Sequence, residues 1–299
     1  MYFKKKTNFY VIFISSIIFL IFLFFITHLF YVDVGNKMNN IENLQNNQEN
    51  TTDNPKYKLS VLAIFKNETM NLKVWIDHYL WQGCEHIYLI DNGSTDNPDE
   101  ILKPYIDNRQ VSLYKLTEKH KQVEHYKTVW KDANMPTQTK WLIMADLDEF
   151  FFAPNNKLID VIDKFDDYDV IYTKWKMFGT DGNDKHPKDI RTSIVYRTLN
   201  NNDHKKWICK TKKITEENIG IHDITGENIK SINENEKIQL NHYPIQSKEF
   251  YSKVKMTRGA ADSIHSENVR DWNYFNKYNE NMDVKDTILK DMVELDLHP

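Results

Sequence analysis

Short apolar runs alternate with amphipathic segments through the middle of the chain. The apolar runs have the length of strands that are buried on both faces, and the segments between them repeat their apolar residues with a helical period. We therefore predict an α/β fold with a mostly parallel central sheet and helices on both faces. The predicted strands are residues 59–65, 86–90, 111–116 and 141–145, and the predicted helices are residues 71–82, 98–106 and 121–132.

The second half of the chain has a weaker pattern. The polar region 186–236 contains only short apolar runs, which predict antiparallel strands and loops. Residues 263–299 are expected to pack as a helical extension on the domain formed by residues 57–262. The other predicted elements are strands at 170–175 and 238–243, a helix at 247–262 and an amphipathic stretch at 284–295.

The N-terminal segment differs from the rest of the chain. Residues 9–32 contain no charged side chain, and at about 1.5 Å per residue such a helix exceeds the ~30 Å hydrocarbon core of a bilayer. Three lysines in the preceding tail, residues 1–8, place that tail in the cytosol by the positive-inside rule. We predict a type II signal anchor, then a flexible polar stem at 33–56, with the rest of the chain on the luminal or extracytoplasmic side. A cleaved signal peptide is the alternative, although its apolar core is normally only about 7–15 residues long.

Polar side chains follow three of the predicted strands at the point where each strand ends. They are residues 66–68, residues 91–92 and the acidic run that contains Asp146 and Asp148. Right-handed crossovers bring the carboxyl ends of parallel strands to one rim, where α/β folds bind ligands. Asp146 and Asp148 are two positions apart, so their side chains converge only if the backbone turns there. Crowded carboxylates need a cation, and a hard divalent ion such as Mg²⁺ or Mn²⁺ suits them.

A solvated acidic turn after a core strand is the alternative, because clustered acids mark functional sites only in some proteins. The cation hypothesis requires Asp91 and Asp148 to lie on the same side of the sheet. It also requires that no lysine fills the gap between them.

The composition excludes several classes of protein. With a formal net charge of -4 and a pI near 6.3, the chain of 299 residues has no basic field for nucleic acid. It has neither the G-x-G-x-x-G fingerprint of dinucleotide-binding folds nor the G-x-x-x-x-G-K-[ST] loop of P-loop NTPases. Cys84 and Cys209 match no zinc or redox spacing, and we expect buried thiols, with a disulfide between them left open.

Five motifs stand in order along the chain. They are AIFKNE at 63–68, YLIDNGSTD at 88–96, KWLIMADLDEF at 140–150, KWKMFGTDG at 174–182, and residues 241–259, which begin NHY and end RG. Together they resemble glycosyltransferases of the GT-A fold, and more narrowly glycosyltransferase family 92 and its relatives near family 2. The resemblance runs from about residue 59 to residue 261.

The resemblance implies a metal-dependent, inverting hexosyltransferase that moves a sugar from a UDP- or GDP-sugar to a glycan hydroxyl. Asp146 and Asp148 would form its D-x-D motif and bind the Mn²⁺ or Mg²⁺ ion that bridges the donor diphosphate. Glu68, Asp91 and Asn92 would contact the nucleoside, whose hydroxyl and N–H donors suit such acceptors.

A histidine and three cations complete the implied site. A histidine beside two acids is a credible third metal ligand, and we expect it to be His242 rather than His222. Lys253, Lys255 and Arg258, on one predicted helix, would neutralise the phosphates. The alternative is that these three cations belong to an ordinary charged helix face.

The general base has two candidates. Asp181 follows the predicted fifth strand in a turn that would bring its carboxylate beside the crevice, and it must reach the acceptor hydroxyl in order to act. Related patterns often carry a smaller polar residue at this position, and an Asp that only hydrogen-bonds the turn is the alternative. Glu149 is the second candidate, although an acid directly after a strand can instead hold the loop.

Two other functions compete with the transferase. A nucleotidyltransferase of related fold would act on sugar phosphates, but it needs a Gly-rich basic loop after the first strand, which residues 66–68 do not provide. A membrane-anchored glycan-binding or scaffold protein would not need the acids that follow the predicted strands. The sequence leaves open the donor sugar, the nucleotide base and the acceptor, because single pocket residues can switch them.

Overall fold

The computed structural model describes residues 55–258 and 270–296. The chain divides into two compact units, residues 1–53 and 54–299, and the fold given below belongs to the second. The predicted tail, the predicted anchor at 9–32 and nearly all of the predicted stem lie outside the described residues. Within the part of the chain that is described, no helix has the length and apolar character needed to cross a membrane.

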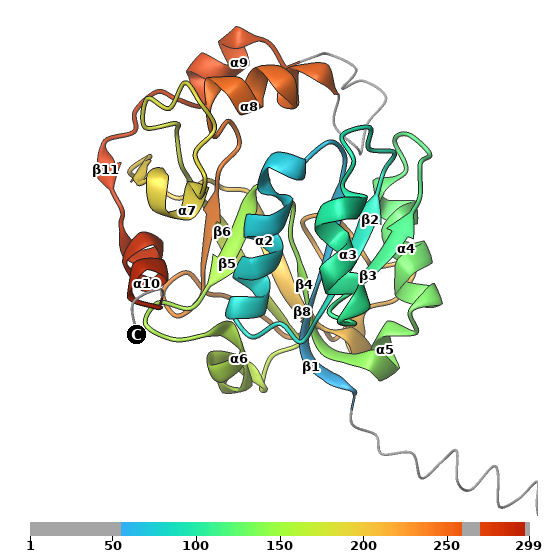
Figure 1. Ribbon diagram of the computed structural model, residues 1–299. Helices are drawn as coiled ribbons and strands as arrows, with labels where there is room; N and C mark the ends of the chain where they lie inside the picture. The colour runs from blue at the N-terminus through green and yellow to red at the C-terminus, as the bar shows by residue number, and fades with distance from the viewer. Residues whose placement is uncertain (1–54, 259–269, 297–299) are drawn as a thin grey trace, which may run out of the picture. The chain divides into compact units, whose positions relative to one another are not determined.

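Strands and helices alternate through the first half of this unit, as predicted (Figure 1). The observed boundaries agree with the predicted ones to within two residues. A short helix, α5 (Met135–Gln138), was not predicted. The remaining elements are β1 (Tyr57–Phe65), α2 (Thr69–Trp81), β2 (His86–Asp91), α3 (Asp99–Asp107), β3 (Val111–Lys115), α4 (Gln122–Asp132) and β4 (Thr139–Met144).

Later strands extend the sheet and make it mixed. They are β5 (Glu149–Phe152), β6 (Val170–Met177), β8 (Lys205–Lys210), β9 (Ser231–Asn233) and β10 (Gln239–His242). The sheet has nine strands in the order β3-β2-β1-β4-β8-β6-β10-β5, with β9 paired to β6. The strands from β3 to β4 are parallel, as predicted, but β8 runs antiparallel to β4 and β6, and β5 runs antiparallel to β10. In the second half β6 is parallel to both β9 and β10. The prediction of a mostly parallel sheet is therefore correct for most pairings, but the sheet is mixed because β8 and β5 run the other way.

The sheet curls around the turn between β4 and β5. Only residues 145–148 connect these two strands, although three other strands lie between them in the sheet. So short a link keeps the end of β4 close to the start of β5, because an extended residue spans at most about 3.6 Å. The turn lies at the carboxyl end of β4, on the rim where its parallel neighbour β1 also ends.

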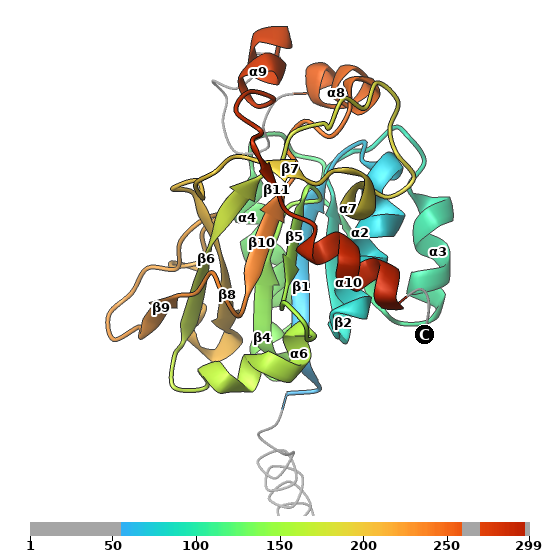
Figure 2. The ribbon, with the colours of Figure 1, turned by 90° about the vertical axis from the view of Figure 1, so that its left-hand side faces the viewer.

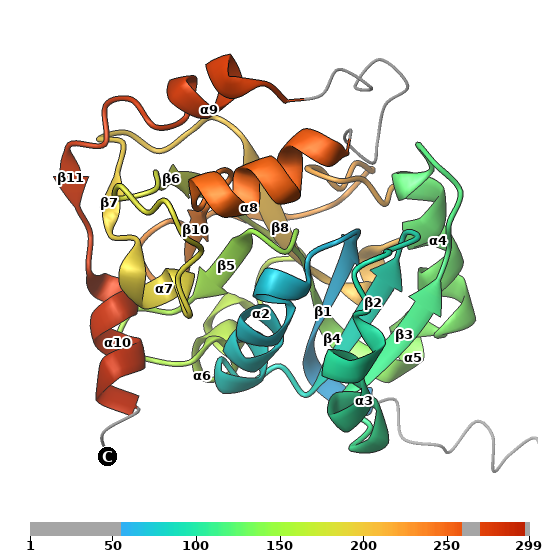
Figure 3. The same cartoon turned by 45° about the horizontal axis from the view of Figure 1, so that its top comes forward.

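Alternate residues of β1 face two hydrophobic cores. Val61 and Ala63 belong to one core with residues of α2 and α3, whereas Leu62 and Ile64 belong to the other with residues of α4. Figures 1 and 3 show α2 and α3 on one face of the sheet and α4 on the other. Successive side chains of a strand point to opposite faces of the sheet, so both faces of β1 are buried. The predicted placement of helices on both faces of the sheet is confirmed.

The elements after β5 are mostly short. The helix predicted at 247–262 ends early, at α8, and is followed by the 3₁₀ turn η3; residues 259–262 lie outside the described residues. The stretch predicted as amphipathic at 284–295 divides into β11 and α10, and Asp286, which lies between them, accepts a hydrogen bond from the backbone N–H of Ile288 at 3.3 Å. These elements are α6 (Leu158–Val161), η1 (Ile162–Phe165), α7 (Ile190–Ser193), β7 (Tyr196–Arg197), η2 (Thr211–Lys213), α8 (Lys248–Lys253), η3 (Lys255–Thr257), α9 (Trp272–Lys277), β11 (Val284–Lys285) and α10 (Ile288–Asp296).

Buried charges tie the C-terminal segment to the rest of the unit. Asp286 Oδ2 lies 2.9 Å from Lys176 Nζ on β6 and 2.7 Å from Arg197 Nε on β7. Nearer the rim, the Asn279 side-chain oxygen accepts a hydrogen bond from the backbone N–H of Thr180 at 3.0 Å. Figure 2 shows β11 and α10 running down this side of the sheet, with α8 and α9 at its top. The segment therefore reaches the rim at which β1 and β4 end.

Both cysteines are buried and neither forms a disulfide. The prediction of buried thiols for Cys84 and Cys209 is confirmed, and the disulfide left open above is not formed.

Candidate active site

Helix α2 holds the acidic turn at the end of β4. The indole N–H of Trp75 donates to the backbone oxygens of Asp146 and Glu149, at 2.9 and 3.1 Å. The hydroxyl of Tyr79, one helical turn further on, donates to the same Glu149 oxygen at 3.0 Å. The i, i+4 spacing puts both donors on one face of α2. The backbone therefore turns at Asp146 to Asp148, as convergence of their side chains requires.

Asp146 and Glu149 share a fully buried lysine. Lys206 Nζ, on β8, lies 2.9 Å from Asp146 Oδ2 and 3.6 Å from Glu149 Oε2. Burial opposes the charge of Lys206, but these two carboxylates outweigh it and raise the pKa of the lysine. Lys206 is therefore an ammonium ion beneath the acidic turn.

Glu149 itself lies within the turn. Burial raises its pKa well above the ordinary value, and Asp146 and Asp148 add to the effect. Its Oε2 atom accepts a hydrogen bond from the backbone N–H of Asp146 at 2.8 Å. This contact matches the interpretation in which Glu149 holds the loop.

Asp148 lies between a histidine and a second lysine. Its Oδ1 atom is 3.6 Å from Nε2 of His242 on β10, and its Oδ2 atom is 2.6 Å from Nζ of Lys255 in η3. Burial alone would raise the pKa of Asp148, but Lys255 and His242 hold it well below its ordinary value. The structure thus brings Asp148 and His242 together, whereas Nδ1 of His222 lies 3.0 Å from the carbonyl oxygen of Lys205.

Glu68, after the end of β1, is joined to the same group of charges. Its Oε1 atom forms an ion pair with the guanidinium of Arg258 and lies 3.9 Å from Lys255 Nζ. We expected no lysine in the gap between Asp91 and Asp148, yet Lys255 fills the neighbouring gap between Glu68 and Asp148. The three side chains Glu68, Asp148 and Lys255 are almost completely buried, as a paired cluster of charges must be.

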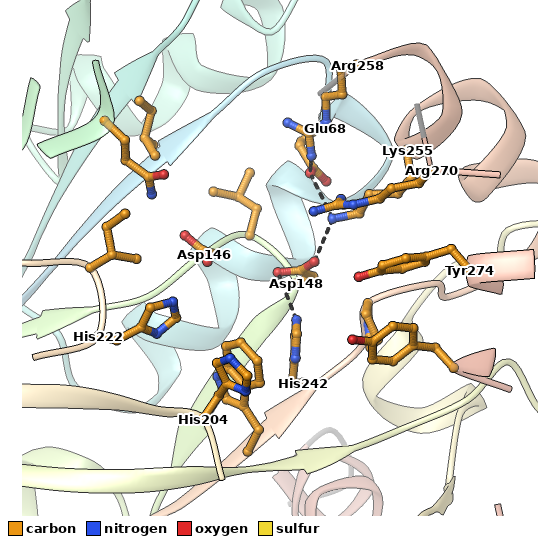
Figure 4. Close-up of a pocket in the computed structure, with 17 residues that line it drawn as sticks. Glu68, Asp146, Asp148, His204, His222, His242, Lys255, Arg258, Arg270 and Tyr274 are labelled. Carbon is orange, nitrogen blue, oxygen red and sulfur yellow. Dashed lines mark hydrogen bonds and ion pairs between the residues drawn. The ribbon is translucent and has the colours of Figure 1, made fainter. Parts of the chain in front are cut away.

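These groups surround a cavity of about 300 Å³ at the rim (Figure 4). Figure 4 shows Arg270 and Tyr274 reaching it from the C-terminal segment, on the side opposite His204 and His222. The cavity therefore places carboxylates opposite basic side chains. Its charged lining residues are Glu68, Asp146, Asp148, Lys255, Arg258 and Arg270.

An aromatic cluster forms another part of the wall. Trp175, on β6, stacks on His204 with ring centroids 5.0 Å apart and an interplanar angle of 10°. The ring of His242 lies 4.2 Å from Trp175 on a tilted approach, and His222 meets it edge-on at 5.6 Å. The indole N–H is buried and has no hydrogen-bond partner among the described residues. Such a wall can pack against the apolar face of a sugar.

The predicted nucleoside contacts are not all brought to the cavity. Glu68 lines it, but Asp91 and Asn92 are not among its lining residues. Asp91 Oδ1 accepts from the backbone N–H of Ser94 at 2.8 Å, and the Asn92 amide donates to the carbonyl oxygen of Leu116 at 2.6 Å. Both side chains thus tie down rim loops, and their contacts with a nucleoside stay predictions.

Two other predicted residues lie away from the cavity. The Asp181 carboxylate accepts hydrogen bonds from the backbone N–H groups of Val195, at 2.5 Å, and Tyr196, at 3.2 Å. Burial raises its pKa in spite of these bonds. Lys253 is exposed and pairs with Glu249 at 2.7 Å. The structure does not bring either side chain to the cavity, so the base and phosphate roles given to them stay predictions.

Sequence reasoning missed three residues of this region. Lys206 lies within β8, and its side chain points to the same face of the sheet as the buried Ile208 two residues later. A lysine that is buried in this way needs a carboxylate partner. Arg270 and Tyr274 belong to a segment in which we had found no chemistry. The only sequence signal there was the density of aromatic residues between 272 and 278.

The predicted metal ligands Asp146, Asp148 and His242 have suitable chemistry for a divalent cation, but only Asp148 and His242 lie close together. Two carboxylates and an imidazole suit Mn²⁺. Among residues 55–258 and 270–296, however, no three His, Cys, Asp or Glu side chains are arranged to hold a metal ion. Asp148 and His242 face each other at 3.6 Å, whereas Asp146 is directed to Lys206 and Lys255 is directed to Asp148. A cation at this position would therefore have to compete with the two lysines.

Comparison with known proteins places the chain in a family. The profile of glycosyltransferase family 92 matches residues 57–298. A glycosyltransferase family 92 protein of Ricinus communis is 25% identical over 117 residues, a match that covers 36% of this chain and 18% of that protein. The aligned part is thus less than a fifth of that relative's length.

Two solved structures are similar to part of the chain. Residues 1–349 of TarS from S. aureus have a TM-score of 0.39 and 17% identity, and the match covers 65% of this chain and 62% of that chain. GalNAc-T7, solved with UDP, GalNAc and Mn²⁺, has a TM-score of 0.39 and 14% identity, and the match covers 80% of this chain and 58% of that chain.

The family match runs from β1 to α10 and includes every residue that lines the cavity. The chain belongs to glycosyltransferase family 92.

Proposed function

We propose that the chain transfers a sugar from a nucleotide diphosphate to a glycan hydroxyl, with a divalent cation and with inversion at the anomeric carbon, on a scaffold of GT-A type. The observation that supports this most directly is the cavity at the rim, in which three carboxylates face three basic side chains. A nucleotide sugar has groups that match both kinds of side chain. Its anionic diphosphate matches the basic side chains, and the hydroxyl and N–H donors of its ribose and base match the carboxylates.

Lys255, Arg258 and Arg270 bind the diphosphate in this proposal. Arginine offers a planar pair of donors to phosphate oxygens, and lysine offers a compact charge. Because these cations lie in a mostly buried cavity, their attraction for the leaving diphosphate is stronger than it would be in water. Glu68 is placed to accept hydrogen bonds from the nucleoside at the same end of the cavity.

Asp146, Asp148 and His242 are the residues that would hold the cation, Mn²⁺ or Mg²⁺. When bound, the cation supplies Lewis-acid stabilisation of the charge that develops on the leaving diphosphate. Lys206 holds the Asp146 carboxylate at the edge of the cavity through a 2.9 Å ion pair, and the backbone N–H of Tyr243 donates to the Asp148 carbonyl oxygen at 2.8 Å. In this proposal the protein contributes to cation binding a turn whose carboxylates are already held in position before any ligand binds.

The acceptor sugar packs against the wall formed by Trp175 and its histidines. Inversion needs a single displacement, in which a base takes the proton of the acceptor hydroxyl while the diphosphate departs on the opposite side of the sugar. Asp181 and Glu149 stay the hypotheses for that base, and their carboxylates are both engaged with backbone N–H groups.

We further propose that residues 9–32 anchor the chain as a single-pass type II membrane protein. The support is the uncharged run itself and the lysines before it. The transfer then takes place on the luminal or extracytoplasmic side.

Calorimetric titration of the full chain in detergent with UDP-sugars and GDP-sugars, with and without Mn²⁺, tests the proposal. We expect one nucleotide class to bind and the cation to tighten its binding. Asp148→Asn should lower transfer by about a hundredfold or more, because it removes a charge next to the reacting phosphates. Asp107→Asn, which makes the same change in an exposed ion pair on α3, should leave transfer unchanged. The proposal fails if no nucleotide sugar binds under any condition, or if Asp148→Asn transfers sugar normally.

A further inference from the structure

Lys255 lies in an unusual place for a lysine. Its side chain is 5% exposed, and its Nζ atom lies 2.6 Å from Asp148 Oδ2 and 3.9 Å from Glu68 Oε1 (Figure 4). The short turn η3 carries it into the cavity, whereas Lys253, two residues earlier, points to solvent and pairs with Glu249. Lys255 is thus a buried positive charge that its two carboxylate neighbours keep stable.

The position of Lys255 conflicts with direct binding of a divalent cation. A cation that uses Asp148 as a ligand would lie within a few ångströms of the ammonium group, and like charges at that distance repel strongly in a poorly solvated cavity. Lys255 releases Asp148 readily only if another anion is available to it, because an unpaired buried ammonium ion is strongly disfavoured. The diphosphate of a nucleotide is such an anion, and the neighbouring Arg258 and Arg270 line the same cavity.

We infer that Lys255 is an exchangeable counter-ion: it neutralises Asp148 in the empty enzyme and passes to the nucleotide diphosphate when a divalent cation takes Asp148. The inference rests on the proposed function and extends it. Cation and nucleotide then bind with positive coupling, because each removes the obstacle to the other. Linkage requires the coupling to be reciprocal, so UDP tightens Mn²⁺ binding by the same factor by which Mn²⁺ tightens UDP binding.

Substitution of Lys255 gives a signature that a merely structural role would not give. In Lys255→Gln the competing charge is gone, so Mn²⁺ alone should bind about tenfold more tightly than to the wild type. The same variant lacks a phosphate partner, so UDP at saturating Mn²⁺ should bind about tenfold more weakly. The two affinities change in opposite directions, whereas general damage to the cavity would weaken both.

Mn²⁺ binding is measured by electron paramagnetic resonance and UDP or GDP binding by calorimetry, each with the full chain and each with and without the other ligand. Lys248→Gln is the matched control, since it makes the same change on an exposed side chain that pairs with Asp184, and it should bind both ligands as the wild type does. The inference is overturned if Lys255→Gln binds Mn²⁺ alone no more tightly than the wild type. If neither UDP nor GDP binds the wild type at any Mn²⁺ concentration, the proposed function fails and the inference falls with it.

A second measurement needs no variant, in case Lys255→Gln does not fold. Modification of the wild type by an amine-reactive ester, followed by mass spectrometry, reports how free each lysine is. Mn²⁺ alone, at saturating concentration, should increase the labelling of Lys255 severalfold, and UDP added with Mn²⁺ should suppress it, while Lys248 changes in neither case. Labelling of Lys255 that does not respond to Mn²⁺ would contradict the exchange.

Discussion

Lys206 Nζ lies 2.9 Å from Asp146 Oδ2. Lys206 belongs to β8, and Asp146 follows the end of β4, the antiparallel neighbour of β8. The lysine side chain is fully buried, whereas the Asp146 side chain is 34% exposed at the edge of the cavity. The buried partner therefore fixes the exposed one. A carboxylate that is held from below in this way keeps its position whether or not a ligand is present.

Lys206→Met should destabilise the fold by about 3 kcal/mol. The substitution preserves most of the side-chain volume but leaves Asp146, and the fully buried Glu149, without their positive partner. Urea unfolding followed by circular dichroism measures the change. Lys210→Met, on the same strand, removes a partly exposed lysine that donates to the backbone oxygen of Asp166 at 2.5 Å and lies 4.0 Å from its carboxylate, and it should cost only about 1 kcal/mol. Equal effects of the two substitutions would contradict a special role for Lys206.

The ion cluster at Asp286 should give the fold a specific dependence on acid. Burial alone would raise the pKa of Asp286, but its hydrogen bonds with Lys176 and Arg197 outweigh burial and lower the pKa. A carboxyl whose pKa is lower in the folded state contributes stability above its unfolded pKa of about 3.9, and this contribution is lost as the pH falls through the folded pKa. Burial also lowers the pKa of Lys176, which bears on the alkaline side, where the pair is lost as the lysine deprotonates, and leaves the acid dependence to Asp286.

Asp286→Asn should therefore lower the free energy of unfolding by about 2–3 kcal/mol at pH 7, and the difference from the wild type should shrink below about pH 4. Denaturant unfolding from pH 3 to pH 7 measures it. Asp203→Asn, which removes a fully exposed partner of Lys174, should have no measurable effect at any pH. A difference for Asp286→Asn that is constant from pH 3 to pH 7 would rule out this account.

The predictable part of the molecule is the part that depends on local pattern. The apolar runs from Leu59 and Trp141 have the length of buried strands, and the helix that carries Trp75 and Tyr79 repeats its apolar residues, so the order and boundaries of the first half follow from sequence alone. The position of β8 between β4 and β6 could not be predicted from local sequence, because it depends on which strands β8 pairs with in the folded sheet. The partners of Asp146 and Asp148 were missed for the same reason: Lys206 and Lys255 are distant in sequence and reach the acids only through that position of β8 and the turn η3.

Arg270 extends this point to ligand binding. It lines the cavity from a segment that the sequence presented as a packing extension, and its guanidinium lies 5.4 Å from the ring centroid of Tyr274. Arg270→Met should weaken the binding of UDP or GDP by about tenfold to a hundredfold, since a hydrogen bond to a charged group contributes about 1.5–3 kcal/mol. Calorimetry at fixed Mn²⁺ measures it. Lys103→Met, an exposed lysine on α3, removes the same charge and should not change nucleotide affinity. Unchanged affinity in Arg270→Met would remove Arg270 from the proposed diphosphate site.

Asp181→Asn separates the two interpretations of Asp181. If Asp181 takes the acceptor proton, the substitution should lower kcat by about 10²–10⁴-fold and abolish the acid limb of the pH–rate profile. If its carboxylate only holds the loop, the amide oxygen of Asn can still accept from a backbone N–H, and the loss should stay within about tenfold. We expect the second result, because the Asp181 oxygens already accept hydrogen bonds from Val195 and Tyr196, and because Asp181 does not line the cavity.

The same comparison applies to Glu149, with one further constraint. Glu149→Gln can keep the hydrogen bond from the backbone N–H of Asp146, but it removes a charge that faces Lys206 at 3.6 Å. Burial raises the pKa of Glu149, so a neutral side chain is disfavoured less at this position than at an exposed carboxylate, and transfer should fall by less than about tenfold. Glu149→Ala removes the hydrogen bond as well, so a larger loss of transfer in Ala than in Gln, with an unchanged pH–rate profile in both, identifies a residue that positions Asp146. Loss of the acid limb in Glu149→Gln would instead make Glu149 the base.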